Sequence, residues 1–272
     1  MNSGFPKKTQ ITYLIAPLDW GLGHATRCIP LISYLLGRGH RVFVCGEGGV
    51  EELIKKELPQ VEFLHLQGYR ISYSKSRNMF WLKLLIQFPK IWFAVKRENK
   101  WLSAIIDQHK IDCVISDNRL GLYNNKAYTI FITHQLGIKT GTKIFDYFAR
   151  KINYSFINRF NECWIPDIDD NKLSIAGELS HPQHLPVVPI KYIGLLSRIH
   201  PTSTQKQYDI AAILSGPEPQ RTLFEKKVKS LLSNYSGSAI VVRGLPGETN
   251  KLDGLPSNIK QANHLDTKEM SL

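Results

Sequence analysis

A glycine-rich turn followed by a histidine is the first stretch of the sequence whose residue types could do chemistry. The stretch DWGLGHATR, residues 19–27, follows the apolar run ITYLIAPL and leads into a helical pattern. Gly21 and Gly23 let a ligand approach the backbone, and the amide groups at the start of a helix attract anions. His24 can take up a proton near neutral pH, as a hydroxyl nucleophile requires. The turn is therefore a candidate for anion binding and for base catalysis.

A carboxylate at the end of a later strand could serve this histidine. Asp117 ends the strand-like run IDCVISD, and the carboxyl ends of parallel strands meet at one edge of a sheet. We expect Asp117 to orient the imidazole of His24, so that the two form a general base. The same residues also fit a plainer interpretation, in which His24 caps its helix and Asp117 begins a turn.

Two further turns carry polar residues at predicted strand ends. His134 and Gln135 end the strand-like run AYTIFITHQ, where a lone histidine is more often structural than catalytic. The turn ILSGPEPQR places Ser215 and Gly216 before a predicted helix, with Arg221 nearby. Small residues at such a turn are typical of phosphate sites, although two prolines also fit a rigid connector.

The elements that must position these residues alternate between strands and helices. Such alternation predicts an α/β fold with a doubly wound parallel sheet. The polar, aperiodic stretch SRIHPTSTQKQ indicates a linker. We expect a first domain over 1–196, a linker over 197–207 and a partial second domain over 208–272. The predicted strands lie within 9–18, 41–47, 61–66, 111–117, 127–135, 161–167, 208–214 and 238–247, and the predicted helices within 25–40, 49–58, 142–160 and 220–232.

Composition narrows the class of protein. The four cysteines, at 28, 45, 113 and 163, lie in apolar runs without a CxxC pair, which indicates buried, reduced thiols rather than disulfides or a zinc site. The first apolar stretch is too short for a signal-peptide core, so we expect a cytoplasmic protein. The net charge of +12 raises the question whether the protein binds nucleic acid. The sequence contains no recognisable nucleic-acid-binding module that would support such a partner.

The positive charge is concentrated in one aromatic segment. Residues 70–100 hold eight Lys or Arg against a single acid, Glu98. Mixed aromatic and cationic side chains are typical of an element that rests on an anionic membrane surface. A core helix pair with exposed lysine ends is the open alternative. The candidate membrane-contact residues are Trp81, Lys83, Lys90, Trp92, Lys96 and Arg97.

A dinucleotide-binding fingerprint is only partly present in the first turn. Gly21 and Gly23 fill two positions of the G-x-G-x-x-G pattern, but Thr26 occupies the third. A nicotinamide-dependent enzyme is therefore the weakest of the hypotheses.

Taken together, these stretches resemble GT-B glycosyltransferases, and in particular the bacterial family 28 enzymes. That family includes the transferase that adds N-acetylglucosamine to the lipid-linked peptidoglycan precursor. The resemblance is carried by APLDWGLGHATRCIPLI and SGPEPQR, and more weakly by SDNRLGLYN, FITHQL and YIGLLSR. It implies two Rossmann-like domains with a cleft between them, the second one incomplete.

The resemblance also implies roles for individual residues. His24 takes the proton of the acceptor hydroxyl and Asp117 orients it. The expected donor is a nucleotide-sugar such as UDP-N-acetylglucosamine, and neither a metal nor a further cofactor is expected to be needed. The basic aromatic segment holds the enzyme at the inner membrane face, beside a glycan or lipid-linked acceptor. Residues expected at the donor are Gly21, Gly23, Ser215, Gly216, Arg221 and Arg243, and those expected at the acceptor are Asn118, Arg119, His134 and Gln135.

The family's donor-gripping motif belongs downstream of Leu272, where this sequence ends. We therefore expect a donor domain cut off part-way. The alternative function is that of an acceptor-binding protein without turnover.

Overall fold

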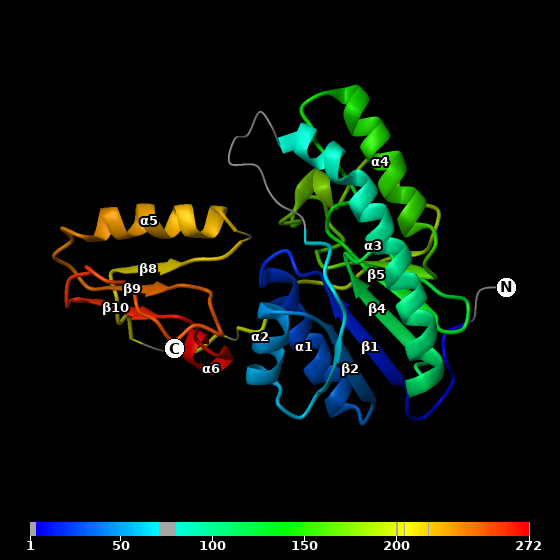
Figure 1. Cartoon of the computed structure of the whole chain (residues 1–272), viewed down its shortest axis with the longest axis horizontal. Helices are drawn as coiled ribbons and strands as arrows, with labels where there is room; N and C mark the ends of the chain where they lie inside the picture. Colours follow the sequence, from blue (N-terminus) through cyan, green and yellow to red (C-terminus); the bar gives the residue numbers. More distant parts are fainter. Residues whose placement is uncertain (1–3, 71–79, 200, 204, 217, 272) are drawn as a thin grey trace.

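The computed structural model describes residues 4–70, 80–199, 201–203, 205–216 and 218–271, with only the backbone at 80–86 and 88. The chain forms two parallel β-sheets, each flanked by helices (Figure 1). The α/β class predicted from the alternating pattern is confirmed. The first sheet ends at Tyr192 and the second begins at Ile210.

The larger sheet has seven strands in the order β3-β2-β1-β4-β5-β6-β7, all of them parallel. The chain builds outward from β1 to β3, crosses back, and continues from β4 on the other side of β1. The direction therefore reverses between β1 and β4, the place where open α/β sheets bind their ligands. The strands are β1 (Thr12–Pro17), β2 (Arg41–Gly46), β3 (Glu62–His65), β4 (Cys113–Asp117), β5 (Tyr128–Ile132), β6 (Glu162–Ile165) and β7 (Ile190–Tyr192).

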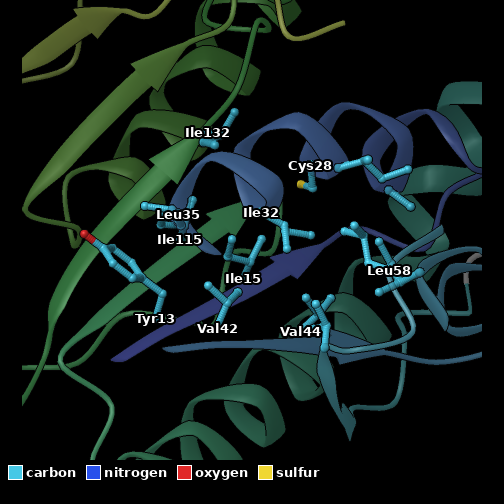
Figure 2. Packing of buried hydrophobic residues seen from close by; sticks show 14 of the residues in the cluster. Tyr13, Ile15, Cys28, Ile32, Leu35, Val42, Val44, Leu58, Ile115 and Ile132 are labelled. Atoms are coloured by element: carbon cyan, nitrogen blue, oxygen red, sulfur yellow. The ribbon is translucent and has the colours of Figure 1, made fainter. Parts of the chain in front are cut away.

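Helices cover both faces of this sheet because its strands are apolar on both sides. In β1, Tyr13 and Ile15 pack toward α1, whereas Leu14 and Ala16 pack toward α3. Figure 2 shows Cys28, Ile32 and other α1 side chains lying over the strands. The helices are α1 (Gly23–Gly37), α2 (Gly49–Glu57), α3 (Phe80–His109) and α4 (Lys143–Ile157), followed by a short 3-10 turn, η2 (Gly177–Leu179).

Several elements differ from the sequence-based expectation, among them the strand Ile259–Ala262 and the helix Thr267–Ser271, which were not predicted. The cationic aromatic segment enters a single long helix, α3, with Pro89 inside it, and not a helix pair. Strand β7 was not predicted, because its three residues are too few to show a period. The other predicted strands and helices are present, with ends that differ by a few residues.

The smaller sheet has three parallel strands in the order β10-β9-β8. Helix α5 packs on it through Val228 and Leu232. Strand β8 lies at an edge, where Ile213 is 54% exposed. The elements are β8 (Ile210–Ile213), α5 (Gln220–Leu232), β9 (Ala239–Val242), β10 (Ile259–Ala262) and α6 (Thr267–Ser271).

One carboxylate joins the two halves of the chain. Glu57, the last residue of α2, is 5% exposed and accepts hydrogen bonds from three residues that follow the first sheet. Arg198 and His264 contact Oε1, the latter at 3.3 Å, and the Thr267 hydroxyl donates to Oε2 at 2.7 Å. A buried charge with several donors is stable only while all of them stay in place. This junction therefore fixes the smaller sheet against α2.

We expect Glu57→Ala to lower the free energy of unfolding by about 3 kcal/mol, because Arg198 is left as a buried, unpaired cation. Denaturant unfolding measures that change, and small-angle scattering should show a larger radius of gyration. Glu62→Ala is the matched control, since the pair of Glu62 with Arg41 is half exposed and worth less than about 1 kcal/mol. Equal effects of the two variants would contradict this role of Glu57.

Candidate active site

The pairing of β1 with β4 places the first turn beside Asp117. Pro17 is in register with Asp117, and the Leu18 amide donates to the Asp117 carbonyl at 3.0 Å. The chain then turns through Gly21 and enters α1 at Gly23. Because both strands end at this edge, the start of α1 lies over the carboxylate of Asp117.

His24 and Asp117 are in direct contact. The His24 Nδ1 lies 3.0 Å from Asp117 Oδ1, and the Asp117 side chain is fully buried whereas that of His24 is 17% exposed. Burial by itself raises the pKa of the carboxyl group, but His24 and Arg27 outweigh it, so the pKa of Asp117 lies below its usual range. No side chain caps α1, so the plainer interpretation of His24 as a helix cap is wrong. The pair has the geometry of a histidine base oriented by a carboxylate.

Arg27, which the sequence-based prediction missed, binds the same carboxylate. Its Nε donates to Asp117 Oδ2 at 2.6 Å, and its Nη2 donates to Oδ1. The same guanidinium contacts His134, whose Nδ1 is 3.0 Å from Nη1. The available signal was the spacing of His24 and Arg27, since residues three apart share one face of a helix.

Cys28 completes the surroundings of the carboxylate. Its sulfur lies 3.7 Å from Asp117 Oδ2, and burial, followed by the charge of Asp117, raises the pKa of the thiol well above its usual value. All four cysteines are free and buried, as the sequence predicted.

The other expected acceptor residues fall in different surroundings. Asn118 follows Asp117 with a φ of 58°, in the left-handed region that asparagine tolerates. Gln135 is exposed, and its carbonyl accepts a hydrogen bond from Asn153 at 3.1 Å. His134 is connected to the His24 and Asp117 cluster through its contact with Arg27.

Arg119 is a structural residue, and its prediction as an acceptor contact is wrong. Its side chain is fully buried and donates to Glu98 at 2.7 Å and to the Gln67 carbonyl at 2.8 Å. Glu98 also accepts from the Tyr69 hydroxyl at 2.8 Å and from the Gly121 amide at 3.0 Å. A side chain without exposed surface cannot touch a ligand, so Arg119 ties α3 to the loop after β4.

A cavity of about 360 Å³ lies between the two halves of the chain, within the size range of small-molecule sites. The glycine turns of both halves meet there: a Cβ atom on Gly21 would lie 3.3 Å from the Gly216 carbonyl carbon. Gly21 has a φ of 91° and Gly216 of 108°, which other residues rarely adopt. The cavity is lined by Asp19, Trp20, Gly21, Leu22, Gly49, Arg70, Ser215, Gly216, Glu218, Arg221, Gly244 and Leu245.

Asp19 lines this cavity but has one carboxylate oxygen that is buried from solvent. Its Oδ1 is buried and has no hydrogen-bond partner among the described residues. A buried carboxylate oxygen without a donor is costly.

The arginines expected at the donor are already bound to acidic side chains. Arg221 lines the cavity but donates to Glu218 at 2.6 Å and to Glu225 at 2.8 Å. Arg243 shares Glu225 and does not line the cavity. Gly23 is exposed, and a Cβ atom there would meet nothing within 4 Å. Of the predicted donor residues, Gly21, Ser215, Gly216 and Arg221 lie at the cavity.

Among the residues that the structure describes, no three His, Cys, Asp or Glu side chains are grouped so that they could hold a metal ion. Metal independence stays a prediction.

The predicted membrane-contact residues lie on α3. Lys90, Trp92, Lys96 and Arg97 are exposed, and Lys96 Nζ lies 5.3 Å from the centre of the Trp92 ring. The side chains of Trp81 and Lys83 fall outside the described part of the structure. No helix in the described residues is long and apolar enough to cross a membrane.

The doubly wound sheet, the smaller parallel sheet and the cavity between them define the architecture as GT-B, as predicted. The order of the central strands, 3-2-1-4-5-6, is that of a Rossmann fold.

Solved structures share this architecture at low sequence identity. The spinosyn forosaminyltransferase SpnP is 12% identical, with a TM-score of 0.54 over 96% of this chain and 72% of its own. A glycosyltransferase of Glycyrrhiza uralensis, crystallised with glycyrrhetinic acid 3-O-monoglucuronide, is 8% identical, with a TM-score of 0.55 over 96% and 70%. A UDP-N-acetylglucosamine 2-epimerase is 9% identical, with a TM-score of 0.50 over 97% and 71%. At these identities the similarity establishes the fold alone.

No protein-family model matches the chain, and a comparison with curated proteins finds no match.

The structural role of Arg119 can be tested by unfolding. We expect Arg119→Met to lower the free energy of unfolding by about 3–5 kcal/mol, because Glu98 is left as a buried charge. Gln135→Ala, in an exposed position, should change it by less than about 0.5 kcal/mol. A variant Arg119→Met that kept normal stability would show that the buried pair does not hold this region together.

Proposed function

We propose that this protein is a glycosyltransferase that moves a sugar from a nucleotide-sugar to an acceptor hydroxyl, with His24 as general base. The observation that carries the proposal is the hydrogen bond between His24 and the buried Asp117 at the edge where β1 and β4 end. This site directly follows the turn that lines the cavity between the two halves. The GT-B fold of the neighbouring structures supports the same class.

The chemistry requires a base on one side and a stabilised leaving group on the other. His24 Nδ1 donates to Asp117, which leaves the lone pair on Nε2 free for the proton of the acceptor hydroxyl. The acceptor oxygen bonds to the anomeric carbon while the bond from that carbon to the diphosphate oxygen breaks. The nucleoside diphosphate leaves with that electron pair.

The glycine turns supply the donor side of the proposal. Backbone amides near Gly21 and Gly216 can approach a diphosphate closely, because neither residue has a side chain. The resemblance to family 28 enzymes makes UDP-N-acetylglucosamine the first donor to test.

The same fold also occurs in an epimerase, so the class of reaction must be identified from the products that form. Transfer releases UDP only when an acceptor is present, whereas epimerisation yields the 2-epimer of the nucleotide-sugar without an acceptor. Binding without either product is the result expected of an acceptor-binding protein.

We also propose that α3 and α4 together form a membrane-binding face. Trp92 of α3 packs against Phe156 of α4, with the ring centres 6.4 Å apart, so the two helices present adjoining surfaces. Exposed lysines flank them at Lys96 and Lys151, as expected for contact with anionic lipid. The exposed apolar residues of this face are Trp92, Phe93, Ile144, Phe145, Tyr147, Phe148 and Ile152.

The role of His24 is tested by comparing binding with turnover. Calorimetric titration with UDP and UDP-N-acetylglucosamine should give micromolar binding for both the unchanged chain and His24→Ala. The variant should lose transfer by a factor of about 10²–10⁴, as expected when a general base is removed.

The matched control is His65→Ala, at an exposed position at the end of β3. It should bind and turn over normally. Unchanged transfer by His24→Ala would disprove the role of His24 as base, and failure of a folded sample to bind either nucleotide would contradict the donor assignment.

The membrane-binding face is tested with vesicles. We expect the chain to sediment with anionic vesicles at low salt and to be released as salt is raised, because screening weakens the attraction of lysines to lipid. Phe145→Asp should abolish this binding. Leu231→Ser is the control, since Leu231 is 71% exposed on α5, away from this face. Equal binding to neutral and anionic vesicles, or none to either, would contradict the proposal.

A further inference from the structure

Arg27 has a contact that base catalysis by His24 and Asp117 does not explain. Its side chain is 14% exposed, and its Nε and Nη2 donate to the two oxygens of Asp117. Such a two-point contact fixes the plane of the carboxylate as well as its position. The remaining nitrogen, Nη1, lies 3.0 Å from Nδ1 of His134. Arg27 is therefore shared between a carboxylate on β4 and a histidine that follows β5.

The contact with His134 has only one consistent proton arrangement. A guanidinium has donors and no acceptor. The Nδ1 of His134 must therefore accept the hydrogen bond, and the proton of the neutral ring lies on Nε2. Burial, followed by the charge of Arg27, lowers the pKa of His134, so the ring stays neutral.

The contacts of His24 have two consistent arrangements, and these differ in function. Its Nδ1 lies 3.0 Å from Asp117 Oδ1 and 2.9 Å from Arg27 Nη2. A proton on Nδ1 is donated to Asp117 and leaves Nε2 as a base. If the proton of the neutral ring lies on Nε2 instead, Nδ1 accepts a hydrogen bond from Arg27 and Nε2 cannot act as a base. The ionised carboxylate is the stronger acceptor, so the first arrangement is favoured.

We propose that Arg27 is a positioning residue that gives the two histidines opposite roles. By fixing the plane of Asp117 it keeps the Nδ1–H of His24 on the carboxylate and the Nε2 lone pair free. By donating to His134 it makes Nε2–H of that ring a hydrogen-bond donor, able to orient the oxygen that His24 deprotonates. This inference rests on the proposed function for its catalytic meaning, whereas the proton arrangement can be measured without turnover.

The experiment is nitrogen-15 NMR of the whole chain labelled at histidine, with signals assigned through His24→Gln and His134→Gln. At neutral pH we expect His134 to be protonated on Nε2 alone and His24 to carry a proton on Nδ1. In Arg27→Met, His134 loses its donor while still facing His24, Asp117 and Asp167. Its titration midpoint should then rise by about one pH unit or more, because the nearby cation is gone and the carboxylates remain.

Two further variants separate charge from geometry. Arg27→Lys keeps the positive charge but cannot bind both carboxylate oxygens at once. The titration midpoint of His134 should therefore stay low, whereas its ring proton should no longer be confined to Nε2. Arg38→Met is the control, because Arg38 lies exposed at the other end of α1. It should leave both histidines unchanged.

A purely structural role of Arg27 predicts a different result: lower stability with unchanged histidine titrations. That result, or a proton on Nδ1 of His134 in the unchanged chain, overturns the proposal. If Arg27→Met does not fold, the double variant with Asp117→Asn removes the unpaired buried charge. In this double variant the ring proton of His134 should no longer be confined to Nε2.

Activity gives an independent measurement. If transfer is found, Arg27→Met should lower kcat, because the plane of the Asp117 carboxylate that orients His24 is no longer fixed. Absence of transfer in every sample counts against the proposed function and leaves the NMR result to decide the role of Arg27.

Discussion

The fully buried carboxylate of Asp117 is the constraint on which the site depends. A charge without exposed surface must be compensated by donors nearby, and here these come from His24 and Arg27 on the first turns of α1. The register of β1 with β4 brings the carboxylate to that helix. The apolar face of α1, packed on the sheet through Cys28 and Ile32, holds the helix there. Strand register, helix packing and site electrostatics thus depend on one another.

Much of the fold could be predicted from the sequence because most strands of the larger sheet are apolar runs and the helices between them have amphipathic patterns. The meeting of His24 with Asp117 was predictable for the same reason, since both follow strands that end at one edge. The contacts of Arg27 were not, because a sequence does not say which cation will neutralise a buried acid. Arg119 shows the same limit: its partner, Glu98, lies 21 residues away on α3, although Glu98 is the single acid of the cationic segment.

In the smaller half of the chain, ion pairs explain why arginines that were predicted to bind phosphate are not free to do so. Arg221 and Arg243 were expected to bind phosphate, yet both donate to Glu225. Both charges are therefore already paired within the fold, and Arg70, which also lines the cavity, is likewise paired with Glu47. The proposed binding of a diphosphate there therefore depends on the two glycine turns more than on free cations.

Helix α2 connects the two places where the halves of the chain meet. Its first residue, Gly49, lines the cavity, and its last, Glu57, is the buried junction; the two are about 12 Å apart along the helix axis. The junction is held by several donors on one carboxylate, whereas the cavity end has the bare contact of Gly21 with Gly216. The two halves are therefore held together more firmly at Glu57 than at the glycine turns, and we expect any separation of the halves to begin at the cavity.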